Sequence, residues 1–239
     1  MEALRLVFDP SGDLLQAARA CEADIFREAY GNSREQLETE YASYEANTTF
    51  LAVADERDQV FAVARVLSPG GPLKTLDDVG REPWSVDPSR SVAAARIDLT
   101  GTWDATTIGV RPGMGRQQSR LAFAIYHGVL AVARANDASS FVAMLDNRVR
   151  RLLNSVGIVT HALPGTVAEP YLGSLATTPV YAHLVPMFDN QRRDLPDAYR
   201  LVTMGAGLEG IDVPPLDHFR YVAKIPVAWQ SVMAPLAVG

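Results

Sequence analysis

Cysteine is nearly absent from this sequence. Cys21 is the only one among 239 residues, which excludes an internal disulfide and a zinc site built from several cysteines. The chain also lacks an apolar run long enough to span a membrane, and the charged residues within Met1–Pro10 are unlike a secretion signal. We therefore expect a cytoplasmic protein that does not use a membrane as a partner.

Positive charge is scarce as well. The sequence has 22 Lys and Arg against 28 Asp and Glu, so its formal net charge is −6. A general nucleic-acid binder normally carries a basic field, so no nucleic-acid partner is expected, although a few Arg residues suffice to hold a nucleotide or a carrier protein. The four histidines have no metal-ligand spacing, and no metal is expected.

Hydrophobic residues make up 48% of the chain, enough for a sizeable core, and their periodicity predicts both helices and strands. In the first half we expect a strand over Leu4–Phe8, a helix from Ser11 to Gly31, a helix from Ser33 to about Tyr44, a hairpin of Thr49–Ala54 and Gln59–Leu67, and a helical turn over Leu73–Val79. In the second half we expect strands over Ala93–Leu99 and Thr102–Val110, a helix from Gln117 to about Ala135, a strand over Ser139–Leu145, a helix capped by Asp146 or Asn147 that ends before Gly157, and a strand over Val180–Met187.

This order is mixed α/β, with hairpins early and helical crossovers late. A doubly wound dinucleotide-binding fold would show regular strand–helix alternation from the start, and the sequence does not. The tail that begins at Asp189 is rich in Pro, Gly and Asp, with only short apolar runs.

A glycine-containing turn, Gly113-Met114-Gly115, separates the strand Thr102–Val110 from the long helix. Free amides at a helix start favour an anion, and glycine lets a phosphate approach the backbone closely. Arg111 and Arg116 flank the turn and can add charged contacts. Turns of this kind are also common as plain structural connections, and both interpretations remain open from the residues alone.

The strand, turn and helix from Ile108 to Leu121 resemble motif A of the GNAT acyltransferases, and Phe141–Gly157 resembles the second half of that core. The resemblance implies a mixed, mostly antiparallel central sheet with splayed strands flanked by helices, over residues 1–187. Residues 188–239 would be a C-terminal extension packing on or near this domain. It also implies a thioester donor bound by the residues of the strand end and turn, namely Ile108, Gly109, Val110, Arg111, Gly113, Met114, Gly115 and Arg116.

Three further stretches resemble the acyl-homoserine-lactone synthases, an autoinducer-synthase branch of that superfamily related to N-acyl amino acid synthases. They are Glu40–Glu45, Ala64–Leu73 and Trp103–Ile108. The resemblance implies a substrate site that uses Glu40, Glu45, Trp103 and Thr107, with Arg65 as its central arginine and Asp104 in place of a catalytic glutamate. The chain departs from the branch at Glu22, Ala42 and Thr107, which indicates an acceptor other than S-adenosylmethionine.

The resulting hypothesis is an N-acyltransferase that moves an acyl group from acyl-CoA or an acyl-carrier protein to the amine of a small, amino-acid-like acceptor. Asp104 is the candidate base or amine-orienting group, amides near Gly109 would polarise the carbonyl, and Tyr181 would protonate the thiolate. The structural alternatives are a turn hydrogen bond for Asp104, an ion pair of Arg65 with Glu40 or Glu45, and simple packing for Tyr181.

A second hypothesis keeps the fold without catalysis, as a module that binds CoA or acyl ligands for sensing or interaction. In a third, residues 189–239 form a lid or a partner-binding element. A homodimer is left open.

Overall fold

The strand-forming segments assemble into one nine-stranded sheet in the computed structural model, which describes residues 3–223. The order across the sheet is β6-β8-β5-β4-β3-β2-β1-β9, and β7 pairs with β8 outside this path. Neighbouring strands are antiparallel except for the β4–β5 and β1–β9 pairs. The strands are β1 (Leu4–Phe8), β2 (Thr48–Ala54), β3 (Val60–Leu67), β4 (Thr102–Val110), β5 (Ser140–Asp146), β6 (His161–Ala162), β7 (Glu169–Tyr171), β8 (Ser174–His183) and β9 (Ile211–Asp212).

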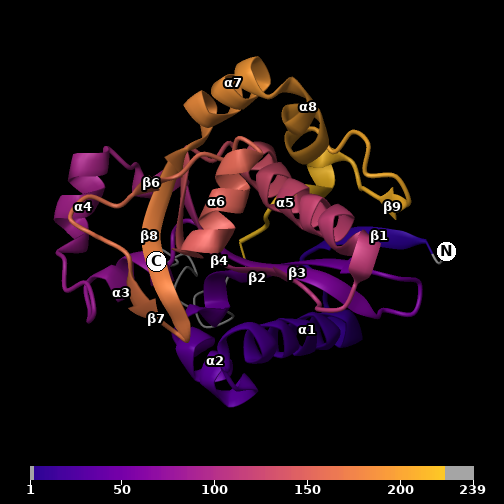
Figure 1. Ribbon diagram of the computed structural model, residues 1–239, viewed down its shortest axis with the longest axis horizontal. Helices are drawn as coiled ribbons and strands as arrows, with labels where there is room; N and C mark the ends of the chain where they lie inside the picture. The colour runs from indigo at the N-terminus through magenta and orange to yellow at the C-terminus, as the bar shows by residue number, and fades with distance from the viewer. Residues whose placement is uncertain (1–2, 224–239) are drawn as a thin grey trace, which may run out of the picture.

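Helices cover both faces of this sheet (Figure 1). One face carries α1 (Gly12–Tyr30) and α2 (Arg34–Tyr41), and the other carries α5 (Gln118–Ala135). The remaining helices and short helical turns are η1 (Ala42–Asn47), α3 (Lys74–Val79), α4 (Pro88–Ala95), η2 (Leu99–Gly101), η3 (Gly115–Gln117), α6 (Asn147–Ser155), α7 (Leu184–Asp194), α8 (Pro196–Ala198), η4 (Tyr199–Thr203) and η5 (Leu216–Phe219). The mixed, mostly antiparallel α/β fold expected from the sequence is confirmed.

The helix boundaries follow the capping residues that the sequence displays. The Ser33 hydroxyl accepts a hydrogen bond from the Gln36 amide at the start of α2, and the Asp146 carboxylate accepts one from the Arg148 amide at the start of α6. Gly31 ends α1 in the left-handed conformation, with φ of 77°. These local signals are independent of packing, which is why they were predictable.

One predicted strand is wrong, and another ends earlier than expected. Ala93–Leu99 is not a strand, because Asp87 caps a helix that has Pro88 in its first turn and extends to Ala95. The last strand ends at His183, because Leu184, Met187 and Gln191 are buried at helical spacing and form the inner side of α7.

The largest hydrophobic cluster lies between the sheet and α5, and it includes Phe219 from the C-terminal part of the chain. Residue 187 lies inside α7, and β9 pairs with β1 at the far edge of the sheet. Within residues 3–223 no helix is long and apolar enough to cross a membrane.

Candidate functional site

The centre of the sheet opens where β4 and β5 separate. Their parallel pairing covers only Thr102–Asp104 opposite Ser140–Val142. Beyond that point β4 continues to Val110 paired with β3 alone, while β5 continues to Asp146 paired with β8. The edge of β4 that faces β5 therefore lacks a strand partner over its last six residues, as the splayed-strand expectation required.

A β-bulge lies at the same place. Arg65 pairs with Thr107 and Val66 pairs with Ala105, so Thr106 is an extra residue on β4. The Thr106 hydroxyl donates to the Arg65 carbonyl oxygen at 3.2 Å, which fixes the extra residue. The bulge bends β4 at the start of the splay.

The free backbone groups of β4 can be assigned from the hydrogen-bond alternation. The Arg111 amide donates to the Phe61 carbonyl on β3 at 2.7 Å. Because antiparallel pairing alternates along a strand, Gly109 also directs its backbone groups toward β3, whereas Ile108 and Val110 direct theirs toward the splay. The available amides therefore flank Gly109 on both sides.

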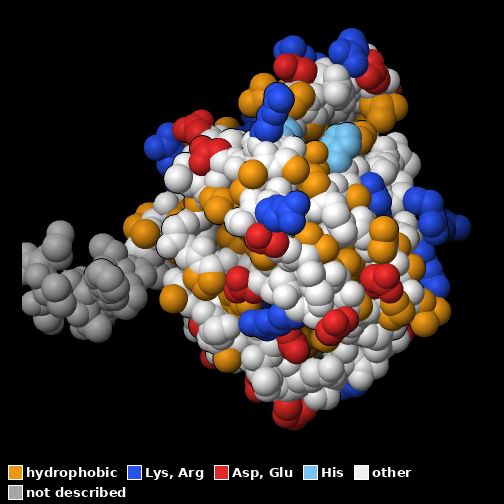
Figure 2. All heavy atoms as spheres, turned by 90° about the vertical axis from the view of Figure 1, so that its left-hand side faces the viewer, with side chains coloured by type: hydrophobic (Ala, Val, Ile, Leu, Met, Phe, Trp, Pro, Cys, Tyr) orange, Lys and Arg blue, Asp and Glu red, His pale blue; other side chains and the backbone are white. Residues whose placement is uncertain are grey.

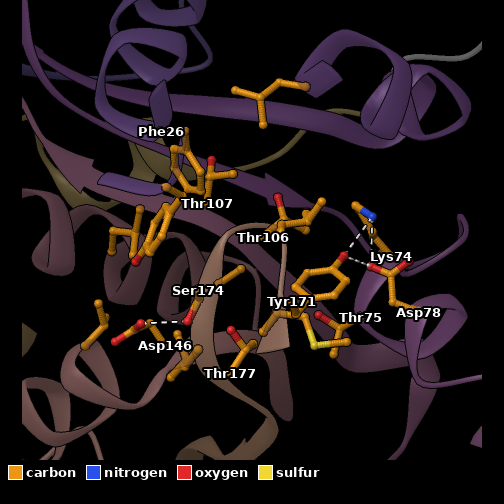
Figure 3. Close-up of a pocket in the computed structure, with 18 of the residues that line it drawn as sticks. Phe26, Lys74, Thr75, Asp78, Thr106, Thr107, Asp146, Tyr171, Ser174 and Thr177 are labelled. Atoms are coloured by element: carbon orange, nitrogen blue, oxygen red, sulfur yellow. Dashed lines mark hydrogen bonds and ion pairs between the residues drawn. The ribbon is translucent and has the colours of Figure 1, made fainter. Parts of the chain in front are cut away.

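A cavity occupies this splay (Figure 3). It holds about 710 Å³ of empty space including its open mouth. Its apolar wall consists of Phe26, Tyr30, Leu37, Tyr41, Ala105, Ile108, Met144, Leu145, Val149 and Leu172. Its polar lining consists of Lys74, Thr75, Asp78, Thr106, Thr107, Asp146, Tyr171, Ser174 and Thr177.

One end of the cavity carries a cluster of charged and phenolic groups. The Lys74 ammonium donates to Asp78 at 2.8 Å, to Glu40 at 2.9 Å and to the Tyr171 oxygen at 3.2 Å. The Tyr171 hydroxyl donates to the Asp78 carboxylate at 2.5 Å. Burial and the adjacent Asp78 charge raise the pKa of Tyr171, so it stays a protonated donor.

The other end carries a second carboxylate, that of Asp146. Its two oxygens accept from the Ser174 hydroxyl and the Arg148 amide, each at 2.7 Å. Figure 3 shows Asp146 and Ser174 well separated from the Lys74, Asp78 and Tyr171 group. The cavity thus has a carboxylate at each end, with apolar side chains and threonine hydroxyls in the rest of its lining.

Asp104 lies behind this lining, with no exposed surface. Its carboxylate accepts from both the amide and the hydroxyl of Thr75, each at 2.7 Å. Burial raises the pKa of Asp104 to about 7, against the opposing effect of these two hydrogen bonds. Thr75 lines the cavity, so its hydrogen bonds connect Asp104 to the cavity lining.

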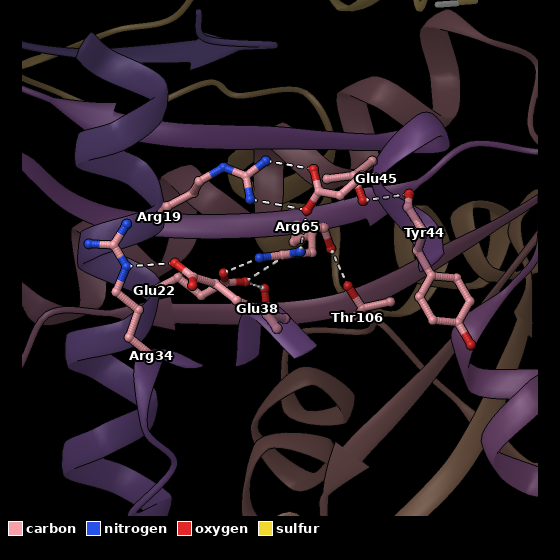
Figure 4. Close-up of polar contacts among 10 residues, drawn as sticks. Arg19, Glu22, Arg34, Glu38, Tyr44, Glu45, Arg65 and Thr106 are labelled. Atoms are coloured by element: carbon pink, nitrogen blue, oxygen red, sulfur yellow. Dashed lines mark hydrogen bonds and ion pairs between the residues drawn. The ribbon is translucent and has the colours of Figure 1, made fainter. Parts of the chain in front are cut away.

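Arg65 forms a buried ion pair with Glu22, a residue that the sequence marked only as a departure from the family pattern (Figure 4). The contacts are Nε–Oε1 at 3.0 Å and Nη2–Oε2 at 2.5 Å. The Thr107 hydroxyl also donates to Glu22 at 2.5 Å. The guanidinium lies over the rings of Tyr41 and Phe50, at 4.0 and 4.7 Å from their centroids.

The two glutamates predicted as substrate residues lie around the cavity rather than in its wall. Glu40 pairs with Lys74. Glu45 is paired bidentately with Arg19 and lies 3.6 Å from Arg65 Nη1. The predicted contact of Arg65 with Glu45 is therefore present, but its main partner is Glu22.

Trp103 and Tyr181 lie outside the cavity wall. Trp103 is buried on the α5 side and makes an edge-to-face contact with Tyr221. Tyr181, on β8, packs between the rings of His161 and His183. Neither side chain is among those that line the cavity.

The turn after β4 is open. Gly113 and Gly115 have φ of 79° and 53°, and a Cβ at either would meet no atom within 4 Å. Arg116 is exposed, whereas Arg111 bonds to Asp24 on α1 at 3.2 Å. The turn leads through η3 directly into α5, which has no side-chain cap at its start.

Sequence reasoning missed Glu22, Lys74, Asp78 and Tyr171 as site residues. Lys74 and Asp78 are four residues apart on a predicted helical turn, which is a recognisable ion-pair spacing. Tyr171 offered no local signal, because only the pairing of β7 with β8 brings it to the cavity. Across residues 3–223, no three His, Cys, Asp or Glu side chains are grouped to hold a metal ion.

Solved structures show the same architecture. An acyl-homoserine-lactone synthase described as CoA-dependent, BjaI with SAM and isopentyl-CoA, is similar at a TM-score of 0.56 and 15% identity, over 92% of this chain and 97% of that one. FeeM, an N-acyl amino acid synthase from uncultured soil microbes, is similar at 0.57 and 10% identity, over 79% and 95%. TofI in an apo form gives 0.51 and 13% identity, over 75% and 91%.

The chain has the GNAT fold. No protein-family model matches the sequence, and no curated protein matches it. At these identities the similarity establishes the fold, and the predicted resemblance is confirmed at that level. The reaction and its substrates have to be argued from the cavity itself.

Proposed function

We propose that this protein is an N-acyltransferase that moves an acyl group from a thioester donor to the amine of a small, amino-acid-like acceptor. The observation that carries the proposal is the unpaired edge of β4, which opens onto a cavity with an apolar wall and charged ends. The donor is acyl-CoA or an acyl-carrier protein. Its pantetheine arm would bond to the free backbone groups of Ile108 and Val110, and its phosphates would lie at Gly113–Gly115.

The reaction forms one C–N bond and breaks one C–S bond. The amine nitrogen attacks the thioester carbon, the C–S bond breaks, and the products are an amide and a thiol. The free amides of β4 stabilise the oxyanion of the tetrahedral intermediate. One proton leaves the amine and one joins the thiolate.

The residues at the charged end can move both protons. Asp78 is the carboxylate nearest Tyr171 in the cavity wall, and we assign it to take the amine proton, directly or through a water. Tyr171 then protonates the thiolate and recovers a proton from Asp78. Asp104 positions Thr75 from behind the wall, and Tyr181 has no part in this scheme.

A second, smaller apolar cavity offers a place for the acyl chain. It lies on the α5 side of the sheet, holds about 290 Å³ of empty space, and shares Ala105 with the first cavity. We expect Ala105→Leu to shorten the longest acyl chain that the enzyme accepts, because the added atoms would stand at the residue that lines both cavities. Rates measured with a series of acyl-CoA chain lengths would test this, and an unchanged chain-length profile would refute the route.

The decisive test of the proposed reaction is thiol release from acyl-CoA and acyl-carrier protein with a panel of primary amines. We expect release that depends on the amine, and a drop in kcat of about a hundredfold in Asp78→Asn. Asp197→Asn, on the exposed surface, is the matched control and should keep full activity.

The alternative is a non-catalytic module that binds CoA or acyl ligands. It is favoured by one feature: the charged groups lining the cavity, Lys74, Asp78 and Asp146, all have partners within the protein. Folded protein that is stabilised by acyl-CoA yet releases no thiol with any amine would support this module and exclude the enzyme.

A further inference from the structure

The two helix starts that open onto the large cavity are already occupied by carboxylates of the protein. Asp104 accepts from the Thr75 amide at the start of α3, and Asp146 accepts from the Arg148 amide at the start of α6. These are the backbone positions that would otherwise attract an anionic group. A carboxylate on a ligand would have to compete with both.

The positive side chains near the cavity are also engaged. Lys74, the cation among the described lining residues, gives hydrogen bonds to Glu40, Asp78 and Tyr171, and it is 3% exposed. Arg65 is held by Glu22 behind the wall. Arg148 is exposed and lies outside the wall of this cavity.

The remaining charge of the cavity is negative. Asp78 and Asp146 lie at opposite ends of the described lining (Figure 3). Two carboxylates against one ammonium in that lining leave an excess that favours a cationic or hydrogen-donating ligand. Apolar side chains make up much of the remaining lining, so a charge placed there would lose part of its hydration.

We infer that the acceptor is a primary amine without a free carboxylate: an amine, a diamine, or an amino acid whose carboxyl group is masked as an amide or ester. This inference rests on the proposed function and specifies its acceptor. An unmodified amino acid would bring its carboxylate between Asp78 and Asp146, and Lys74, the cation among the described lining residues, is already bonded to Glu40, Asp78 and Tyr171. A neutral amide, or a second ammonium group, would find a carboxylate within reach at either end.

The test compares matched pairs that differ at the carboxyl group: leucine with leucinamide, lysine with 1,5-diaminopentane, and tyrosine with tyramine. Binding of each compound to the full-length protein is measured by calorimetry, so the result does not depend on turnover. We expect at least one carboxyl-free compound to bind about tenfold or more tightly than its partner. Equal or tighter binding of the carboxylate members, or no binding by any carboxyl-free member, overturns the inference.

A designed cation gives an independent measurement. Val149 lines the cavity from α6, and Val149→Lys adds a positive charge, whereas Val149→Met adds similar length without charge. The preference for the carboxyl-free compound should fall about tenfold in the Lys variant and stay near the wild-type value in the Met variant. The same shift in both variants would count against a charge-based preference.

Thiol release from acyl-CoA, recorded with the same compounds, separates the two proposals. A binding preference without any thiol release contradicts the enzyme and leaves the preference intact. Faster release with the free amino acids confirms an enzyme and overturns the inferred acceptor.

Discussion

Arg65 is a buried charge, and Glu22 is its main counter-charge. Two aromatic rings enclose its guanidinium, and Glu22 supplies a bidentate partner from α1. Thr107, on the bulged part of β4, completes the coordination of the same carboxylate. The pair therefore ties α1 to the strand that opens the cavity.

Glu22→Gln should lower the free energy of unfolding by about 3 kcal/mol, because it removes the bidentate counter-charge of the buried Arg65 and leaves it with the more distant Glu45 carboxylate, 3.6 Å from Nη1. Urea unfolding measures the change. Glu45→Gln is the control, since Glu45 pairs with Arg19 at a side chain 43% exposed, and a loss below about 1 kcal/mol is expected. Equal losses of unfolding free energy in the two variants would show that the buried Glu22–Arg65 pair stabilises the fold no more than the exposed Glu45–Arg19 pair does.

Asp104 makes a pH-dependent contribution to stability. Its pKa in the folded protein, about 7, is higher than the ordinary value of 3.8. The folded state therefore holds a proton between about pH 4 and 7 that the unfolded chain has released, and stability falls as pH rises through this window.

We expect wild type to lose up to about 4 kcal/mol relative to Asp104→Asn between pH 4 and 7, since one pKa unit corresponds to about 1.4 kcal/mol. Urea unfolding of both proteins at four pH values gives this difference, and changes common to the two cancel. A difference that does not vary with pH would mean that Asp104 keeps an ordinary pKa.

The sequence pointed to individual residues near this site, but it did not reveal which residues they would bond to. Arg65 and Asp104 were named through the resemblance of their stretches to the acyl-homoserine-lactone synthases. Glu22, the partner of Arg65, is separated from it by 43 positions, and only the packing of α1 on β3 brings the two together. Thr75 reaches Asp104 in the same way, through the position of α3.

At the scale of elements, Gly109 sets how closely α1 approaches β4. A Cβ on Gly109 would lie 2.7 Å from Cγ2 of Ile25, too close for any real contact. Gly109→Ala should therefore displace α1 and lower the free energy of unfolding by about 1–3 kcal/mol.

Ile25→Ala removes the atom that would clash, so it supplies the matched background. The cost of Gly109→Ala should be smaller in the Ile25→Ala protein than in wild type, and a double-mutant cycle by urea unfolding measures the coupling. Additive costs would indicate that the Ile25 side chain is not what the added Cβ of Gly109→Ala strains against.

Elements with a strong period or a cap were predictable, and those decided by neighbours were not. The long helix α5, which ends at Ala135, and the hairpin of β2 and β3 show their hydrophobic periodicity clearly in the sequence. Ala93–Leu99 has strand-like composition, but Pro88 and Asp87 start a helix before it. β6 and β7 are two and three residues long and exist through pairing with β8.

At the scale of the whole molecule, charge is dispersed. Figure 2 shows acidic and basic side chains interspersed on the face that it presents, so no large patch of one charge sign covers that face. This mixture accompanies a formal net charge of −6 for the whole sequence.

The chain after residue 187 contributes to the same core. Phe219 is fully buried and contacts the rings of Phe8 and His127, from β1 and α5. Gln191 and Thr203 are also buried and bond to each other. We propose that the part of the extension up to residue 223 stabilises the fold rather than serving as a detachable lid.

Phe219→Ala should lower the free energy of unfolding by about 3–5 kcal/mol, because it leaves a cavity between β1 and α5. Leu216→Ala, in the same short helical turn but 40% exposed, should change it by less than about 1 kcal/mol. Urea unfolding of both variants gives the comparison, with acyl-CoA turnover recorded on the folded protein. Similar small losses in both, accompanied by altered turnover, would instead assign this segment to a mobile cover over the site.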